Sequence, residues 1–251
     1  MAAGPSRRRP GLHSPVVVID PPAPASLLVV MAHPDDAEFS AGGTVARWTD
    51  AGARVAYCVC TDGDKGTSDP SRDPREVAEQ RIAEQRAAAR VLGVEEVIFL
   101  GHPDGTLQAT LDLRRDVVRV IRQVRPEAVL CPDPTRRFGP QYINHPDHRA
   151  IGEVALDAVY PSARDPLVFP ELVEAGLQPH KVAQVFVSNP SEPTCLVDIS
   201  STLERKIEAL RQHRSQITDD RLHEFIPRRA AEIGAPHGLA AAEAFALIRL
   251  G

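Results

Sequence analysis

The sequence predicts a doubly wound α/β fold, in which a mostly parallel sheet carries helices on both faces within a single domain. Short apolar segments alternate with amphipathic stretches from residue 26 onward, which is typical of strands connected by helical crossovers. The chain has 251 residues, of which 43% are hydrophobic, so it is long enough to bury one substantial core.

Six apolar segments are the predicted strands. Their apolar residues are nearly continuous, which indicates strands covered on both faces, as in a parallel sheet. The segments are 26–32, 53–61, 95–100, 127–132, 181–188 and 194–199. Cys58 and Cys60 lie two positions apart in the second segment, so both should point to one face of the sheet. We expect them, with Cys131 and Cys195, to be reduced core residues.

Helices are expected between these strands. Asp73 is a predicted N-cap followed by a proline, and Gly93 marks the end of the same helix. Apolar residues over 113–124 have the spacing of a helix that packs on a sheet, and Pro126 ends it. A further helix is expected to begin near Pro146.

The first 24 residues are rich in proline and arginine and show no hydrophobic period. We therefore expect a flexible arm over 1–24 and one domain over 25–251. The apolar run 16–19 is too short for a signal peptide, and no segment has the ~20 apolar residues that span a bilayer, so a cytoplasmic protein is expected. The net charge of −5 favours neither nucleic acid nor a membrane as a partner. The oligomeric state stays open, a homo-oligomer included.

Three His-Pro-Asp strings carry the candidate chemistry. They begin at His33, His102 and His145, each after a predicted strand or in the region that follows one. Loops that follow parallel strands lie at one edge of the sheet, where such folds bind ligands. Two strings carry a second ligand-type residue three positions on, Asp36 and His148, and residues i and i+3 share a face of a helical turn. Two imidazoles and one carboxylate with an open position are typical of catalytic zinc.

The strings belong to a longer series that resembles the LmbE-like (PIG-L) family of zinc-dependent N-acetylglucosamine deacetylases. The resemblance covers about residues 26–160. Its motifs are, in order, Ala32-His33-Pro34-Asp35-Asp36, Gly42-Gly43, Thr61-Asp62-Gly63, Arg81-Ile82-Ala83-Glu84, Leu92-Gly93-Val94, Pro103-Asp104-Gly105 and Asn144-His145-Pro146-Asp147-His148. One departure is Ala37-Glu38, where many members have Glu directly after the two aspartates.

The resemblance implies a Rossmann-like fold and hydrolysis of an amide. The reaction would be N-deacetylation of an N-acetylglucosamine-type sugar or sugar conjugate, a small-molecule substrate, with a metal-bound water as the nucleophile. One Zn²⁺ per chain would be bound by His33, Asp36 and His148. Zinc lowers the pKa of bound water from ~15.7 toward ~7 and polarises a carbonyl, which is the chemistry that amide hydrolysis needs.

Further roles also come from the resemblance. Asp35 would be the general base, and His145 the acid or the oxyanion partner. Asp147 would orient His145, while Arg81 and Asp104 would contact the substrate. The position of Asp35 next to a predicted metal ligand supports its role as the base, because such a side chain can accept a proton from the bound water.

Three other functions are weighed against this one. A family amidase would cleave a larger thiol-sugar conjugate, and a non-catalytic Rossmann-like protein would only bind a metal or a sugar. A cofactor-binding protein such as a methyltransferase would carry GxGxxG after the first strand, where this chain has His33-Pro34-Asp35-Asp36. Loops 62–73, 133–144 and 160–180 are expected to shape the pocket.

Overall fold

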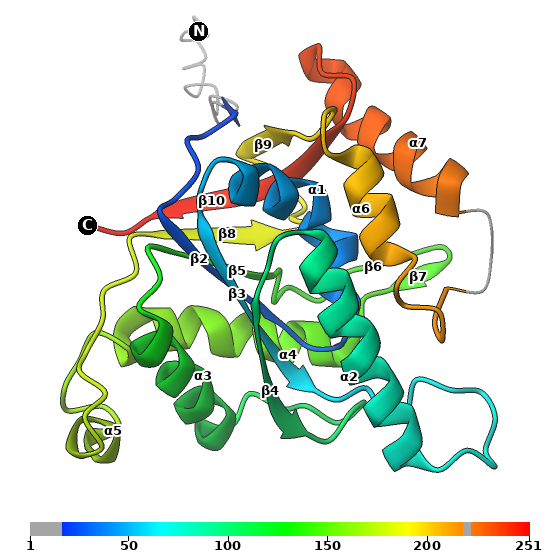
Figure 1. The fold of residues 1–251 in the computed structure, drawn as a ribbon. Coiled ribbons are helices and arrows are strands. Elements are labelled where there is room, and N and C mark those ends of the chain that lie inside the picture. Colours follow the sequence, from blue (N-terminus) through cyan, green and yellow to red (C-terminus); the bar gives the residue numbers. More distant parts are fainter. Residues whose placement is uncertain (1–16, 218–221) are drawn as a thin grey trace, which may run out of the picture.

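A computed structural model describes residues 17–217 and 222–251. Its main sheet has eight strands in the order β1-β9-β10-β8-β5-β2-β3-β4 (Figure 1). Five neighbouring strands are parallel: β4 (Glu96–His102), β3 (Arg54–Thr61), β2 (Ser26–Met31), β5 (Ala128–Pro132) and β8 (Gln184–Ser188). The predicted mostly parallel α/β fold in a single domain is confirmed. Within the described ranges, no helix is long and apolar enough to cross a membrane.

The other end of the sheet is mixed. Strand β10 (Ala242–Arg249) runs antiparallel to both β8 and β9 (Cys195–Asp198), and β1 (Val18–Ile19) pairs in parallel with β9. The predicted arm is therefore wrong at its C-terminal end, because an edge strand lies within it; residues 1–16 fall outside the described ranges. Strand β10 was not predicted. The six predicted segments all contain strands of this sheet.

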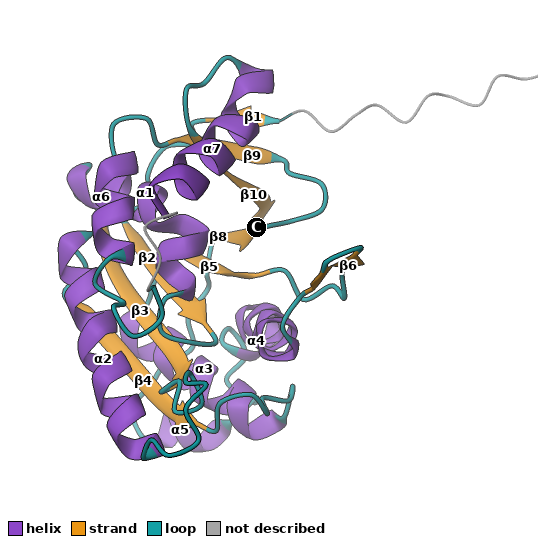
Figure 2. Ribbon diagram, turned by 90° about the vertical axis from the view of Figure 1, so that its right-hand side faces the viewer, coloured by secondary structure: helices purple, strands orange, loops and turns teal. Residues whose placement is uncertain are grey.

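Helices cover both faces of the sheet (Figure 2). On one face lie α1 (Asp36–Asp50), α2 (Pro74–Val91), α6 (Leu203–Leu210) and α7 (Leu222–Gly234); on the other lie α3 (Leu111–Val124) and α4 (Pro146–Asp157). Shorter elements are the π-helical turn Ala158–Ser162, α5 (Pro170–Glu174), the 3₁₀ turn Ala235–His237 and the hairpin of β6 (Phe138–Gly139) and β7 (Tyr142–Ile143). The side chain of Asp73 caps α2, and Gly93 follows it at a φ of +80°, as predicted.

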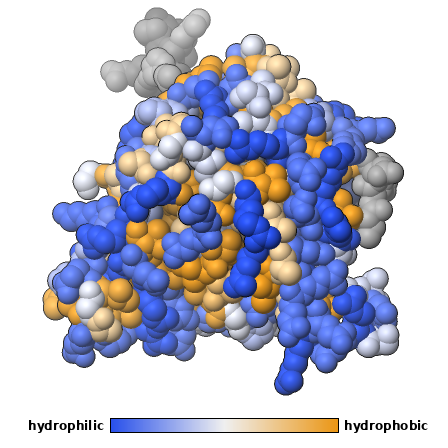
Figure 3. Space-filling model, viewed as in Figure 1, coloured by the Kyte–Doolittle hydropathy of each residue, from blue (hydrophilic) through white to orange (hydrophobic). Residues whose placement is uncertain are grey.

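Successive residues of each central strand enter two separate cores. Leu27 and Val29 pack under the first group of helices, while Leu28 and Val30 pack under α3 and α4. This two-sided burial explains why the strand segments are continuously apolar. All four cysteines are free and buried, as predicted. On the surface, apolar side chains gather near the partly buried edge strand β4 (Figure 3).

The strand order positions the functional groups. Strands β2 and β5 are neighbours in the sheet. From β2 the chain continues to β3 on one side, and from β5 it continues to β8 on the other side. Such a switch point opens a crevice at the carboxyl ends of the two strands. Helix α1 begins five residues after β2, and α4 follows β5 beyond the β6–β7 hairpin. Both His-Pro-Asp strings with paired ligand-type residues therefore lie at this crevice.

Candidate active site

Local backbone geometry brings the two strings to one point. His33 lies two residues beyond β2, and Asp35 takes a left-handed conformation with a φ of 94° before α1 begins at Asp36. His145 is the N-cap of α4, and its Nδ1 accepts a hydrogen bond of 3.2 Å from the backbone N–H of Asp147. The first turn of α4 then carries His148 toward α1.

Three predicted ligand atoms converge at the crevice. His33 Nδ1 lies 3.4 Å from Asp36 Oδ2 and 3.2 Å from His148 Nε2, and His148 Nε2 lies 3.0 Å from Asp36 Oδ1. A tetrahedral ion with ligand bonds of about 2.0–2.2 Å places its ligand atoms roughly 3.3–3.6 Å apart. The separations in the structure are close to these values. The two imidazoles and one carboxylate thus fit a zinc ion in both chemistry and spacing.

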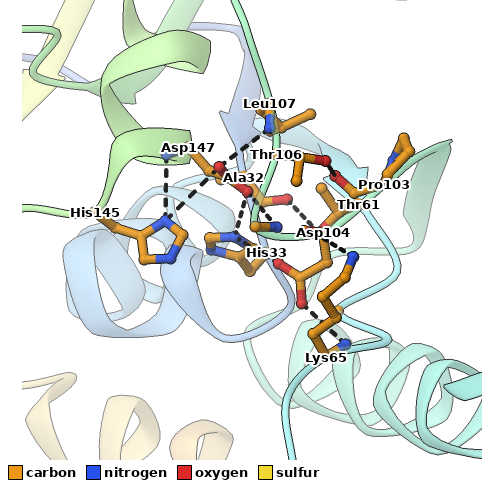
Figure 4. A network of polar contacts seen from close by, with 12 residues as sticks. Ala32, His33, Thr61, Lys65, Pro103, Asp104, Thr106, Leu107, His145 and Asp147 are labelled. Atoms are coloured by element: carbon orange, nitrogen blue, oxygen red, sulfur yellow. Dashed lines mark hydrogen bonds and ion pairs between the residues drawn. The ribbon is translucent and has the colours of Figure 1, made fainter.

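The other nitrogen of the His33 ring faces two carboxylates (Figure 4). Its Nε2 lies 3.1 Å from Asp104 Oδ1 and 3.2 Å from Asp147 Oδ2. Burial opposes protonation of His33, but hydrogen bonds to Asp104 and Asp36 outweigh burial and raise its pKa to about 10. Burial also opposes ionisation of Asp104, yet the contact with His33 lowers its pKa to about 2. A carboxylate behind a metal-binding histidine fixes its tautomer and ring orientation.

Asp104 and Asp147 are both buried and both contact His33. The substrate contact expected of Asp104 and the orientation of His145 expected of Asp147 stay predictions. Asp147 accepts hydrogen bonds from the backbone N–H groups of Gly105 and Leu107, and its carboxylate is 4.0 Å from His145 Nδ1. It therefore supports His33 and the loop after β4 more directly than it supports His145.

His145 stands beside the ligand cluster and is partly open to solvent. Its ring centroid is 4.8 Å from that of His33, at an interplanar angle of 88°, and its side chain is 44% exposed. Burial and the neighbouring His33 lower its pKa. Because Nδ1 accepts a backbone hydrogen bond, Nε2 is the nitrogen left to exchange a proton with a ligand.

Asp35 is held in place by two residues of α2. Its backbone N–H donates to Gln85 Oε1 at 2.8 Å, and its Oδ2 lies 3.2 Å from Arg81 Nη2. Burial and the charge of Asp36 raise the pKa of Asp35 to about 7, although Arg81 opposes this shift. A carboxyl group with a pKa near neutrality is suited to accept and release a proton.

Arg81 is buried beside Asp35, and the substrate contact expected of it stays a prediction. Its guanidinium donates to the carbonyl oxygens of Pro34, at 2.7 Å, and Gly63, at 3.1 Å, as well as to Asp35. A Cβ at Gly63 would lie 2.3 Å from Arg81 Nη1, so only glycine allows the arginine to pack on this turn. Arg81 therefore positions Asp35 and the Pro34 carbonyl.

A buried network behind Asp35 was not predicted. Gln85 Nε2 donates to Glu38 Oε1 at 2.9 Å, and Glu38 Oε2 lies 3.2 Å from His213 Nε2. All three side chains are fully buried. The signal in the sequence was Glu38 itself, which stands one position beyond the usual glutamate of the family motif. In the His-Pro-Asp string that follows β4, only Asp104 reaches His33, whereas His102 pairs with Asp116 on α3 at 3.0 Å.

A cavity of about 240 Å³ opens at Asp36 and His148. Of the three loops expected to shape it, 133–144 contributes Asp133, Arg137, Tyr142 and Asn144. Within the part of the chain that the structure describes, loops 62–73 and 160–180 contribute no lining residue.

Comparison with known proteins agrees with this geometry. The family model described as GlcNAc-PI de-N-acetylase (PIG-L) matches residues 28–159, which span β2 to the end of α4 and both ligand strings. This chain belongs to the PIG-L family.

Several relatives of this PIG-L protein are N-deacetylases. The diacetylchitobiose deacetylase of Thermococcus kodakarensis is 37% identical over 194 residues, covering 77% of this chain and 71% of that protein. The 1D-myo-inositol 2-acetamido-2-deoxy-alpha-D-glucopyranoside deacetylase of Kineococcus radiotolerans is 28% identical, covering 90% and 78%. The solved N,N'-diacetylchitobiose deacetylase from Pyrococcus horikoshii superposes with a TM-score of 0.83 at 31% identity, covering 90% of this chain and 84% of that one.

Proposed function

We propose that this PIG-L protein is a zinc-dependent hydrolase that removes the acetyl group from an N-acetylglucosamine-type sugar or sugar conjugate. The observation that carries the proposal is the cluster of His33, Asp36 and His148, in which the two imidazole nitrogens and the Asp36 carboxylate oxygens lie 3.0–3.4 Å from one another. The relatives supply the reaction class, because they are deacetylases of N-acetylated sugars.

The predicted ligand set suits zinc, which binds imidazole nitrogen and carboxylate oxygen. When bound, the ion supplies Lewis acidity, which acidifies water and polarises an amide carbonyl. The side chains of Asp104 and Asp147 accept the hydrogen at Nε2 of His33, so that Nδ1 keeps its lone pair for the ion.

The chain's own residues then handle the protons. Asp35 takes a proton from the attacking water as the new carbon–oxygen bond forms, and Arg81 and Gln85 hold its carboxyl group and backbone in place. His145 Nε2, whose ring lies beside that of His33, stabilises the developing oxyanion or donates a proton to the amine as the carbon–nitrogen bond breaks.

The direct test measures metal and turnover on the same preparations. We expect about one zinc per chain by elemental analysis, and loss of it in His33→Ala, Asp36→Ala and His148→Ala. Amine release is measured over N-acetylglucosamine, its short oligomers and larger thiol-sugar conjugates. Full metal content in all three variants would refute the ligand assignment. Metal binding without turnover on any substrate would favour a non-catalytic binding protein.

A further inference from the structure

A second cavity adjoins the one at the predicted metal ligands. Its volume is about 820 Å³, within the range of ~300–1,000 Å³ typical of ligand pockets, whereas the inner cavity of about 240 Å³ lies below it. Both cavities are lined by Phe39, Ser40, Arg137, Tyr142 and Asn189. The two cavities therefore share a wall, and only the inner one is lined by Asp36 and His148.

The outer cavity, here called the groove, offers exposed aromatic rings. Tyr142 lies on the β6–β7 hairpin, which stands out from the body of the molecule beside α4 in Figure 2, and Phe225 lies on α7. Tyr142 is 58% exposed, Phe225 48% and Phe39 40%. Rings that are this exposed on a groove next to the site can pack against a flat or cyclic unit of a ligand.

Arg137 stands where the two cavities meet, and its position is fixed by its backbone. Its N–H donates to Asn144 Oδ1 at 2.9 Å, and its carbonyl accepts from the N–H of Asn144 at 3.1 Å. Its side-chain Nε is buried without a hydrogen-bond partner among the described residues. The Oδ2 atom of Asp133 lies 3.9 Å from this Nε, which is an ion-pair distance but beyond hydrogen-bond distance.

The acidic groups that line the groove are paired with cations. Glu243 accepts from Lys206 Nζ at 2.6 Å, and Glu232 lies 3.8 Å from Arg228. Neither of these two glutamates therefore presents an unpaired carboxylate to a ligand in the groove. A guanidinium with hydrogen-bond capacity at the junction favours a carboxylate or a phosphate, because its planar donors match both anions.

We propose that the groove binds the unit to which the amino sugar is attached, and that Arg137 selects substrates in which this second unit carries an anionic group. The inference rests on the proposed deacetylase function and narrows its substrate to anionic conjugates. Arg137 would determine specificity by binding; it takes no part in the proton transfers.

Three aryl N-acetylglucosaminides that differ only in the para group provide the test: a carboxylate, a phosphate monoester and the uncharged carboxamide. We expect kcat/KM of the wild-type protein to favour at least one anionic substrate over the carboxamide by about 10-fold or more, the scale of one hydrogen bond to a charged group. The two anionic arms show whether carboxylate or phosphate is preferred. Arg137→Gln should abolish the preference, mainly through KM.

The matched control is Arg136→Gln, which removes the same charge from an exposed neighbour that lines neither cavity. This variant should keep the preference. Calorimetric binding of the corresponding aryl glucosides, which have no acetyl group to lose, supplies a readout that needs no turnover. Equal kcat/KM and equal binding of charged and uncharged ligands by the wild-type protein would overturn the proposal. If no substrate is deacetylated but binding still prefers the anion, the proposed function fails and the groove assignment stands.

Discussion

Gln85→Met tests whether the network behind Asp35 positions the proposed general base. Methionine has a similar length and a similar helix propensity, so the change removes the polar end of the side chain and little else. Two hydrogen bonds disappear, the one from Asp35 N–H at 2.8 Å and the one to Glu38 Oε1 at 2.9 Å. Each leaves a buried or partly buried polar group without its partner, at a cost of about 1–3 kcal/mol.

The loss for the two groups together is roughly 2–6 kcal/mol of unfolding free energy. For a chain of this size that lowers the melting temperature by roughly 5–20 °C. Turnover should also fall. A non-glycine residue in the left-handed region is unfavourable by about 1–2 kcal/mol, and Gln85 helps to hold Asp35 at its φ of 94°. If the turn relaxes, the competent conformation must be regained in each cycle, and kcat drops by about 5- to 30-fold.

The assay measures the melting temperature, the zinc content and kcat on one preparation of each variant. Gln123→Met, on the exposed face of α3, is the matched control and should change none of the three. Full zinc content with lower kcat is the expected pattern for Gln85→Met. A lower melting temperature with unchanged kcat per folded molecule would show that the network stabilises the fold without positioning Asp35, and the reasoning would be refuted.

Three more perturbations separate catalysis, folding and metal binding. Asp35→Asn should keep zinc and stability while losing turnover on the order of 10²–10⁴-fold, and normal turnover in this variant would rule out a general base at this position. Deleting residues 1–22 should lower the melting temperature below that of a 1–16 deletion, because only the longer deletion removes β1 from the edge of β9; equal melting temperatures would contradict this. Gly152→Ala places a Cβ 2.4 Å from the carbonyl oxygen of Pro132, so it should destabilise by about 1–3 kcal/mol and weaken zinc binding, measured by denaturation and metal titration. Gly→Ala in a helix ordinarily stabilises by about 1 kcal/mol. A gain in stability on Gly152→Ala would therefore contradict the prediction.

Most of the sheet could be predicted because its determinants are local. The strands β2, β3, β5 and β8 are buried on both faces, so continuous apolar runs mark them without any knowledge of their neighbours. Strand β10 escaped prediction because five of its eight residues are alanine, arginine or glutamate, and its place depends on pairing with both β8 and β9. The two residues of β1 form a strand only because β9 offers them an open edge.

The same division applies to the candidate site. Ligand spacing is local: with His33 after a strand, Asp36 one turn later and His148 in the first turn of α4, the sequence alone predicts which side chains meet at the crevice. The partners of those side chains were decided by tertiary packing. Asp104 reaches His33 because the loop after β4 folds over the end of β2, and Arg81 reaches Asp35 because α2 packs beside the β2–α1 turn. Such contacts join residues 46 or more positions apart, and the periodicity of one segment carries no information about the surface that another segment will present to it.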